Sequence, residues 1–298
     1  MSATATSDLY RTDSAARSSR IAFGALLLRD LWVLRKNLRA FIPRTIVQPL
    51  LLCFVFLYVF PTIGTGVGGG RGGVSESGFA TILVAGVIGL SIMFQGIQAV
   101  ALPMVQEFGY TKEIEDRVLA PLPVVLVALE KVVFGALQGL LAAAIVFPIA
   151  AVVHASSIHI NLQVHWLTLV TLIPLACITC SALGLTFGTI FDPRNVPLMF
   201  GIVILPLTFL GGTYYAWTTL EPVKAEGLSW LQYLVLINPL VYINEGSRAA
   251  LTSSNHMTLW AVYPALVGFS ALFLWVGTRN FTRRVISLAL ITPRSAAV

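Results

Sequence analysis

Long apolar stretches without carboxylates are the feature that most constrains what this chain can fold into. A bilayer core about 30 Å thick is crossed by roughly 20 apolar residues in a helix, whose backbone groups are all hydrogen-bonded internally. Six such stretches predict an all-α polytopic membrane protein with six transmembrane helices, at about residues 45–63, 79–104, 132–153, 166–190, 197–215 and 258–277.

The composition indicates that lipid is the main solvent of this chain. Hydrophobic residues make up 57% of it and charged residues only 11%, against about 25% charged residues in a soluble domain. These proportions exclude intrinsic disorder and argue against a nucleic-acid-binding role for the net charge of +6. Cys53, Cys177 and Cys180 all lie in apolar stretches, so they do not form the disulfide framework of a small secreted protein.

The distribution of Lys and Arg predicts the orientation of the chain in the cytoplasmic membrane. If both termini are cytoplasmic, all but three of the 19 Lys and Arg residues face the cytoplasm, the exceptions being Arg71, Lys224 and Arg248. This asymmetry follows the positive-inside bias. The apolar run 230–243 is too short for a span and contains a proline, so we interpret it as a re-entrant or interfacial segment on the outer side. A seventh span there would place the basic tail, residues 282–298, outside.

Two kinds of sequence precede the first span. Residues 1–19 lack the apolar core of a signal peptide and are predicted to form a disordered cytoplasmic tail. Residues 20–41 place leucines at helical spacing and charged residues on other faces, which predicts a basic amphipathic helix in the plane of the cytoplasmic interface. Such a helix either only anchors the chain to anionic lipids or also contacts a cytoplasmic partner. Its charged residues are Arg29, Asp30, Arg35, Lys36 and Arg39.

The connection between the second and third spans is the most polar part of the chain after the N-terminal tail. Thr111 precedes acidic residues, as the N-cap of a helix does, and Pro121 and Pro123 would end such a helix before the third span. We predict a short charged helix that receives mechanical force from a cytoplasmic partner; the alternative is a solvated connector. The residues expected to contact the partner are Glu107, Phe108, Tyr110, Lys112, Glu113, Ile114, Glu115, Asp116 and Arg117.

No motif indicates catalysis, nucleotide binding or a metal site. A GxGxxG match at 64–69 follows a span and opens no helix, and GxxxxGK[ST] does not occur, so the chain is not expected to hold ATP by itself. His154, His159 and His165 share one outer loop without a carboxylate or cysteine, so we expect no metal ion there. No nucleophile has a base at a recognisable spacing. We therefore predict that the chain binds no cofactor and is not an enzyme.

Small residues within the spans predict a closely packed bundle. Gly135 and Gly139 form one small-xxx-small face, and Gly184 and Gly188 form another. No carboxylate lies within a span core. An ion-coupled secondary transporter normally needs a buried carboxylate or broken helices near the midplane. The spans therefore argue against that class of transporter.

Three segments, in order, resemble the membrane subunit of a type-2 ABC exporter over about residues 20–281. The first is the amphipathic helix that leads into span one. The second is the charged connection, similar to the family pattern E-x-x-x-G-T-x-E-x-L-x-x-x-P-L, with Glu107, Thr111, Glu113, Leu119 and Pro121 near the expected places. The third is similar to N-P-L-x-Y-x-x-E-x-x-R, with Asn238, Pro239, Leu240, Tyr242, Glu245 and Arg248 in those positions. The chain departs from the family at 214–217, where YYAW lacks the proline of Y-x-P-W.

The resemblance implies a complex of two permease subunits, as a homodimer or a related heterodimer, with two copies of a separate ABC ATPase that carry ATP and Mg²⁺. The charged connection would pass the motion of the ATPase to the spans. The implied function is export of an amphipathic drug, lipid or glycoconjugate; an ion-coupled carrier and a non-transport membrane scaffold or enzyme are the alternatives. Side chains suited to a substrate path, or equally to bundle packing and an interfacial belt, are Phe94, Gln98, Phe209, Tyr214 and Tyr215.

Overall fold

Long helices dominate the structure. The computed structural model describes residues 3–63, 76–109, 122–153, 162–191, 200–220, 230–253 and 255–291. All regular secondary structure in these ranges is helical, which confirms the predicted all-α class for the described part of the chain. Five helical segments are long and apolar enough to cross a membrane, namely Leu38–Val59, Gly78–Gly109, Val124–Ile149, Trp166–Ile190 and Leu259–Ser287.

These segments correspond to five of the six predicted spans. Helix α7 has the predicted limits, whereas the other four begin or end several residues outside them. The elements are α2 (Leu38–Cys53, continued by a π-helical segment, Phe54–Val59, and by α3, Phe60–Thr62), α4 (Glu76–Gly109), α6 (Val124–Val152), α7 (Trp166–Ile190) and α12 (Leu259–Ile291).

The described part of the predicted span 197–215 is shorter than expected. It consists of a π-helical segment, Phe200–Ile204, and α9, Leu205–Phe209, each of five residues. The chain then turns, and Gly212 has a φ of 69°, a left-handed conformation that glycine adopts without steric cost. This turn ends the helix before residue 215, whereas the start of the predicted span, 197–199, lies outside the described residues.

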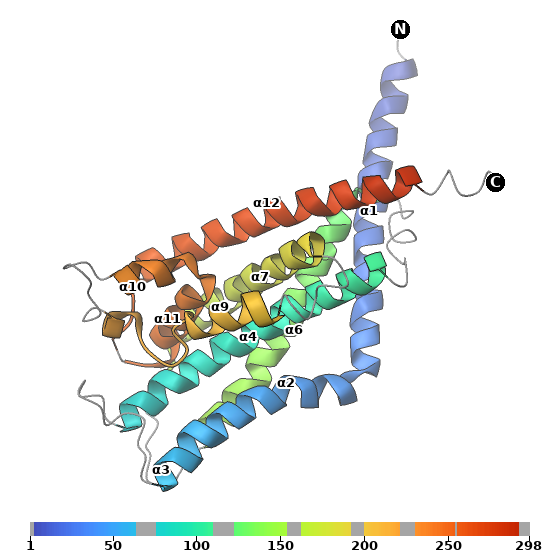
Figure 1. Ribbon diagram of the computed structural model, residues 1–298. Helices are drawn as coiled ribbons and strands as arrows, with labels where there is room; N and C mark the ends of the chain where they lie inside the picture. Colours follow the sequence, from blue (N-terminus) through green and yellow to red (C-terminus); the bar gives the residue numbers. More distant parts are fainter. Residues whose placement is uncertain are drawn as a thin grey trace.

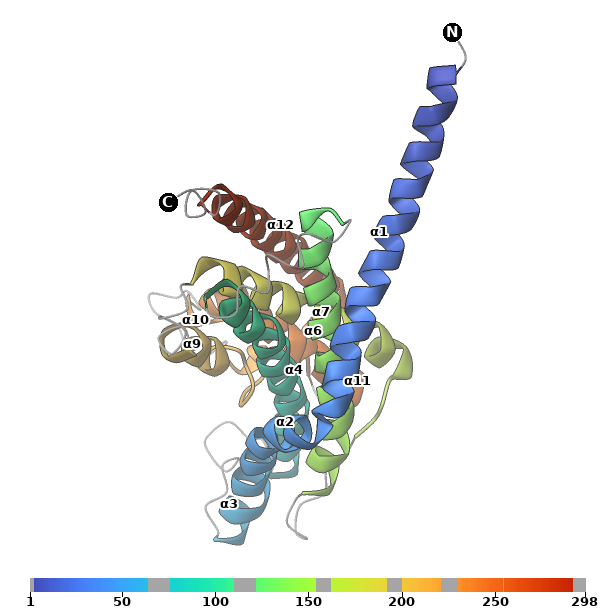
Figure 2. The same cartoon turned by 90° about the vertical axis from the view of Figure 1, so that its right-hand side faces the viewer.

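The N-terminal region differs from the sequence prediction in two ways. Helix α1 spans Ala3–Lys36, so the backbone is helical through most of the stretch 1–19 that was expected to be disordered; no Gly or Pro precedes Gly24 to interrupt it. The single helix expected over 20–41 is two helices, because α1 ends at Lys36 and α2 begins at Leu38. Figures 1 and 2 show α1 crossing the bundle steeply before α2 turns into it.

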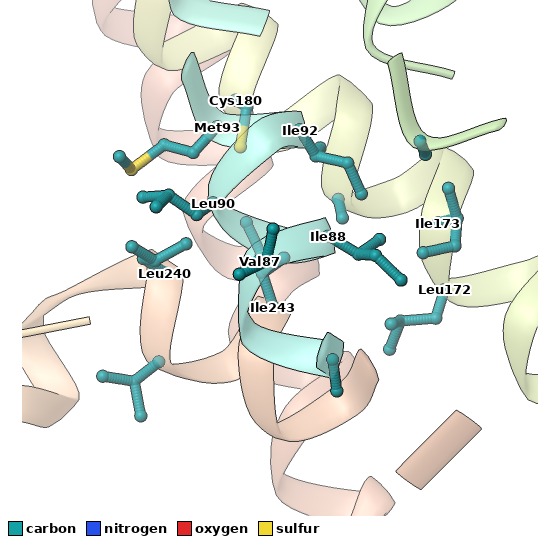
Figure 3. Packing of buried hydrophobic residues seen from close by; sticks show 14 of the residues in the cluster. Val87, Ile88, Leu90, Ile92, Met93, Leu172, Ile173, Cys180, Leu240 and Ile243 are labelled. Carbon is teal, nitrogen blue, oxygen red and sulfur yellow. The ribbon is translucent and has the colours of Figure 1, made fainter. Parts of the chain in front are cut away.

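Helix α4 lies at the centre of the bundle. Within its most apolar window 89% of the residues are buried, against 22% for α2 and 17% for α12. It packs mainly against α7 and α6, and α12 packs on the other side of α7. Figure 3 shows side chains of α4 meeting those of α7 and of α11 (Pro239–Leu251) in this core. Polar side chains on α4 are therefore held inside the protein.

Glycines allow α4, α6 and α7 to approach one another closely. A Cβ on Gly184 would lie 2.8 Å from the carbonyl oxygen of Ile97, and one on Gly139 would lie 3.2 Å from Sγ of Cys177. Both small-xxx-small faces predicted from the sequence thus lie at helix contacts. Cys177 and Cys180 are buried in the same packing.

The two ends of the bundle differ in construction. Helices α10 (Trp230–Leu234) and α11 lie at one end, which we call the α11 end. The C-terminal end of α12 and the junction of α1 with α2 lie at the other, the α1–α2 end (Figure 1).

Candidate functional site

The outer motif predicted from the sequence folds into short helices that break at Asn238. Its Oδ1 accepts a hydrogen bond from the backbone N–H of Leu240 at 2.9 Å, so it caps α11. Its Nδ2 donates to the carbonyl of Leu207 at 2.6 Å, which ties the cap to α9. Pro239 occupies the first turn, where its missing N–H costs nothing. The Asn-Pro pair therefore sets both the start of α11 and its attachment.

Glu245 and Arg248 form a buried ion pair on α11. Nη1 of Arg248 donates to Oε1 of Glu245 at 2.8 Å, and the two side chains are 0% and 1% exposed. Burial lowers the pKa of Arg248, an effect that the negative charge of Glu245 opposes. A second guanidinium nitrogen donates to the carbonyl of Gly212. Removing one partner of such a pair leaves an uncompensated buried charge.

The same carboxylate holds two other parts of the chain. Its Oε1 accepts from the backbone N–H of Trp217 at 2.7 Å, and its Oε2 accepts from that of Met257 at 2.8 Å. Asn244, the residue before Glu245, donates to the carbonyl of Gly211 at 2.8 Å. Side chains of α11 thus hold the turn after α9 and the start of α12 through hydrogen bonds to their backbone groups. We call this network the α11 clasp: Asn238, Asn244, Glu245 and Arg248 with their backbone partners.

Nearer the α1–α2 end, polar side chains connect α2, α4 and α6. Nε2 of Gln95 donates to Oε1 of Gln138 at 3.0 Å, and Oγ1 of Thr45 donates to Oε1 of Gln95 at 3.4 Å. Arg44 donates to Oε1 of Gln98 at 2.5 Å. This row of amides comes from α4 and α6, with Gln95 and Gln138 buried, and the sequence shows it only as separate glutamines.

A groove of about 340 Å³ runs beside this row, within the size range of small-molecule sites. We call it the Arg44 groove. Helices α1, α2, α4 and α6 all contribute to it, with both amides and apolar side chains. Its lining residues are Val33, Leu34, Asn37, Ala40, Phe41, Arg44, Gln95, Gln98, Ala99, Leu102, Pro103, Gln106, Phe134 and Gln138.

The residues predicted to form a substrate path fall into two groups. Phe94 and Gln98 lie together on α4 beside a second, narrower recess next to Arg44. Phe209, Tyr214 and Tyr215 lie together: the ring centroids of Phe209 and Tyr214 are 6.3 Å apart, and the hydroxyl of Tyr215 donates to the carbonyl of Phe209 at 3.0 Å. The ring centroid of Tyr214 also lies 5.5 Å from that of Phe56, in the π-helical segment after α2. Only the first group adjoins the Arg44 groove.

Glu107 and Phe108, predicted to contact a cytoplasmic partner, are engaged within this chain. Nζ of Lys131 on α6 lies 2.6 Å from Oε1 of Glu107, and both side chains are buried. The ring of Phe108 packs edge-on against Phe281 with centroids 5.7 Å apart, beneath the guanidinium of Arg284. These two residues therefore hold the end of α4 against α6 and α12. The other predicted contacts, Tyr110 and Lys112 to Arg117, lie outside the described residues.

The charged residues predicted for the interfacial helix are distributed over α1 and α2. Arg29, Arg35 and Lys36 on α1 and Arg39 on α2 are exposed, and Asp30 is half-buried. Nζ of Lys36 lies 3.4 Å above the ring of Trp32, a cation–π contact. The chain thus presents basic side chains on both sides of the α1–α2 junction.

The histidine loop predicted on the outer side falls mostly outside the described residues. His154 and His159 are not among them. His165 precedes α7, and its backbone N–H donates to the carbonyl of Ala250 at 2.7 Å. Within the described ranges no group of three or more His, Cys, Asp and Glu side chains is close enough to hold a metal ion.

Comparison with known proteins accords with this architecture. The sequence model of the ABC-2 type transporter membrane domain matches residues 21–252. The chain is 27% identical over 254 residues to the inner membrane transport permease YadH of Escherichia coli K12, an alignment that covers 83% of this chain and 91% of that permease. The permeases of the same name from Escherichia coli O157:H7 and Shigella flexneri match to the same extent. Because the family model covers most of its length, this chain belongs to the ABC-2 type transporter family as a transmembrane permease.

Proposed function

We propose that this chain is the permease subunit of an ATP-driven exporter that moves an amphipathic drug, lipid or glycoconjugate out across the cytoplasmic membrane. The observation that carries the proposal is the Arg44 groove, a mixed polar and apolar site between membrane-spanning helices of an ABC-2 permease. The sequence contains no P-loop, so ATP hydrolysis is assigned to two copies of a separate ATPase subunit. A second permease subunit, identical or related, would complete the complex.

Reconstitution tests the function. The permease and its ATPase, purified together and placed in proteoliposomes, are expected to move a fluorescent amphipath only when ATP is supplied, and the permease alone is expected to hydrolyse no ATP. Transport driven by an ion gradient without ATP would instead identify a secondary transporter. Absence of a co-purifying ATPase together with absence of transport would favour the scaffold alternative.

We propose six crossings with both termini in the cytoplasm. Five long apolar helices lie in the described residues, and α9 supplies part of the remaining crossing. In Figure 1 the C-terminal end of α12 and the α1–α2 junction lie at the same end of the bundle, as an even number of crossings requires.

Cysteine labelling checks this topology. Single cysteines replacing Ser75 or Ser229 are expected to react with an impermeant thiol reagent added to intact cells, whereas cysteines replacing Ser14 or Ser295 are expected to react only after the membrane is opened. The native cysteines among the described residues are buried, so background labelling is low. Labelling of position 295 from outside would contradict the six-span topology.

We also propose that the charged connection transmits force from the ATPase. Replacing Glu113 and Glu115 together by Lys would set like charges against the basic groups they meet, and losing a desolvated charge pair at an interface costs about 2–5 kcal/mol. The double variant is expected to insert normally but to lose transport and transport-stimulated ATP hydrolysis. Arg29→Glu with Arg35→Glu, on the exposed face of α1, is expected to cause a smaller defect. Wild-type transport by the Glu113/Glu115 variant would identify the connection as a mere solvated linker.

A further inference from the structure

Arg44 is an exposed charged residue near the start of a helix that is long and apolar enough to span the membrane. It lies on α2, within the segment Leu38–Val59. Ionisable residues in spans are costly, face the protein interior or a cavity, and mark functional sites. In the described part of the chain Arg44 pairs with the neutral amide of Gln98 and with no carboxylate. Its positive charge is therefore not compensated by a permanent ion pair, in contrast to Lys131 and Arg248.

The groove beside Arg44 offers two further kinds of surface. One wall carries the amide side chains of Gln95, Gln98, Gln106 and Gln138. Apolar side chains also line it, and the largest come from α2, α4 and α6: Phe41, Leu102 and Phe134. The groove extends to Asn37, where α1 meets α2. A ligand that fills it would meet a cation, a row of hydrogen-bonding groups and apolar walls together.

This combination selects the chemical class of the occupant. A purely apolar ligand would cover the exposed guanidinium of Arg44 without supplying a negative charge to it, which is unfavourable. A small soluble anion would satisfy Arg44 but leave the apolar walls uncovered. An amphipath with an acidic head satisfies all three surfaces at once, and charge-assisted bonds from Arg to carboxylate or phosphate are the strong ones.

We propose that the Arg44 groove binds an anionic amphipath, with its acidic group at Arg44, its polar portion along the glutamines and its apolar chain against Phe41, Leu102 and Phe134. The proposal deepens the exporter function and rests on it, since it names the class of cargo. The groove includes Val33, Leu34 and Asn37, which neighbour the basic residues of α1 in sequence. In the proposed topology this end faces the cytoplasm, so an anionic amphipath would enter from the cytoplasmic leaflet.

A binding titration tests the groove without ATP. The permease–ATPase complex carries a bimane fluorophore on Asn37→Cys, at the rim, and sits in nanodiscs of phosphatidylcholine. Dodecyl phosphate, inorganic phosphate and dodecanol are titrated separately. We expect saturable binding of dodecyl phosphate. We expect Arg44→Gln to weaken it about tenfold or more, the loss of one charge-assisted hydrogen bond, and Arg44→Lys to weaken it less.

Two matched variants separate the groove from general surface charge. Arg39 is an exposed arginine on the same helix and does not line the groove, so Arg39→Gln is expected to bind dodecyl phosphate as the parent does. Ala40 lines the groove, and Ala40→Phe is expected to weaken dodecyl phosphate binding by filling it. The melting temperature of each variant confirms that it is folded.

Defined outcomes overturn the proposal. Equal effects of Arg44→Gln and Arg39→Gln would show general electrostatic attraction, and equal affinity for inorganic phosphate would show an anion site that does not recognise the apolar chain. Absence of saturable binding in a complex that exports an amphipath with ATP would remove the groove and leave the proposed function. Saturable binding in a complex that never transports would keep the binding site in the groove and overturn the proposed export function.

Discussion

Arg248→Met is expected to destabilise the protein by about 3–5 kcal/mol, the cost of removing one partner of a buried ion pair. Glu245 would remain in its place, since its carboxylate also accepts hydrogen bonds from the backbone N–H groups of Trp217 and Met257. It would then be a buried negative charge without its cation. We expect a fall in the midpoint of thermal unfolding of the detergent-solubilised protein and a loss of transport by the assembled complex.

Two comparisons make this result specific to the α11 clasp. Arg283 is exposed on α12, and Arg283→Met is expected to unfold at the temperature of the parent. Glu245→Gln keeps the shape of the side chain, but an amide can offer only one acceptor oxygen where the carboxylate now accepts at both. It is therefore expected to be destabilised as well. If Arg248→Met and Arg283→Met unfold at the same temperature, the clasp contributes nothing to stability.

Gly184→Leu is expected to prevent normal packing of α7 against α4. A Cβ at this position would lie 2.8 Å from the carbonyl oxygen and 2.9 Å from the Cα of Ile97. Both are backbone atoms of a central helix, so neither can move aside as the end of a flexible side chain can. Overpacking typically costs about 1–3 kcal/mol and occasionally more, and a backbone clash in the core belongs at the upper end. The measurement is the yield of folded permease from membranes by size-exclusion chromatography.

The chain provides a matched glycine for comparison. Gly268 lies in α12, and a Cβ there would meet nothing within 4 Å. Gly268→Leu is expected to give the parental yield, since it adds an apolar side chain to a helix that can span a membrane. A normal yield of Gly184→Leu would mean that α4 and α7 can separate without cost, contrary to the packing described here.

The sequence predicted best those features that depend on the chemistry of single segments. Helix α7 has the predicted limits 166–190, because a run of apolar residues in a bilayer has no alternative to helical hydrogen bonding. The short length and the proline of segment 230–243 likewise predicted a break, and α10 and α11 are separated at Asn238. The prediction for 197–215 extended too far, since the hydropathy of its last residues conceals the turn at Gly212.

The candidate sites were only partly predictable, because their residues meet from different helices. Glu245 and Arg248 were recognised as a motif, but their backbone partners Trp217 and Met257 carry no sequence signal: a main-chain N–H belongs to every residue except proline. Glu107 was predicted to face a partner protein. Its pairing with Lys131 became visible only when α4 and α6 were placed side by side.

By itself the sequence determined that this protein lies in a lipid bilayer, that it is helical and where most of its spans are. Each of these follows from the free energy of moving one segment into lipid. The tertiary structure decided which polar groups share a site. Arg44, Gln95, Gln98 and Gln138 come from three helices, and their distances in the sequence say nothing of their contact. The physical reason is that packing of small residues brings α4 close to its neighbours, and only that approach forms the groove.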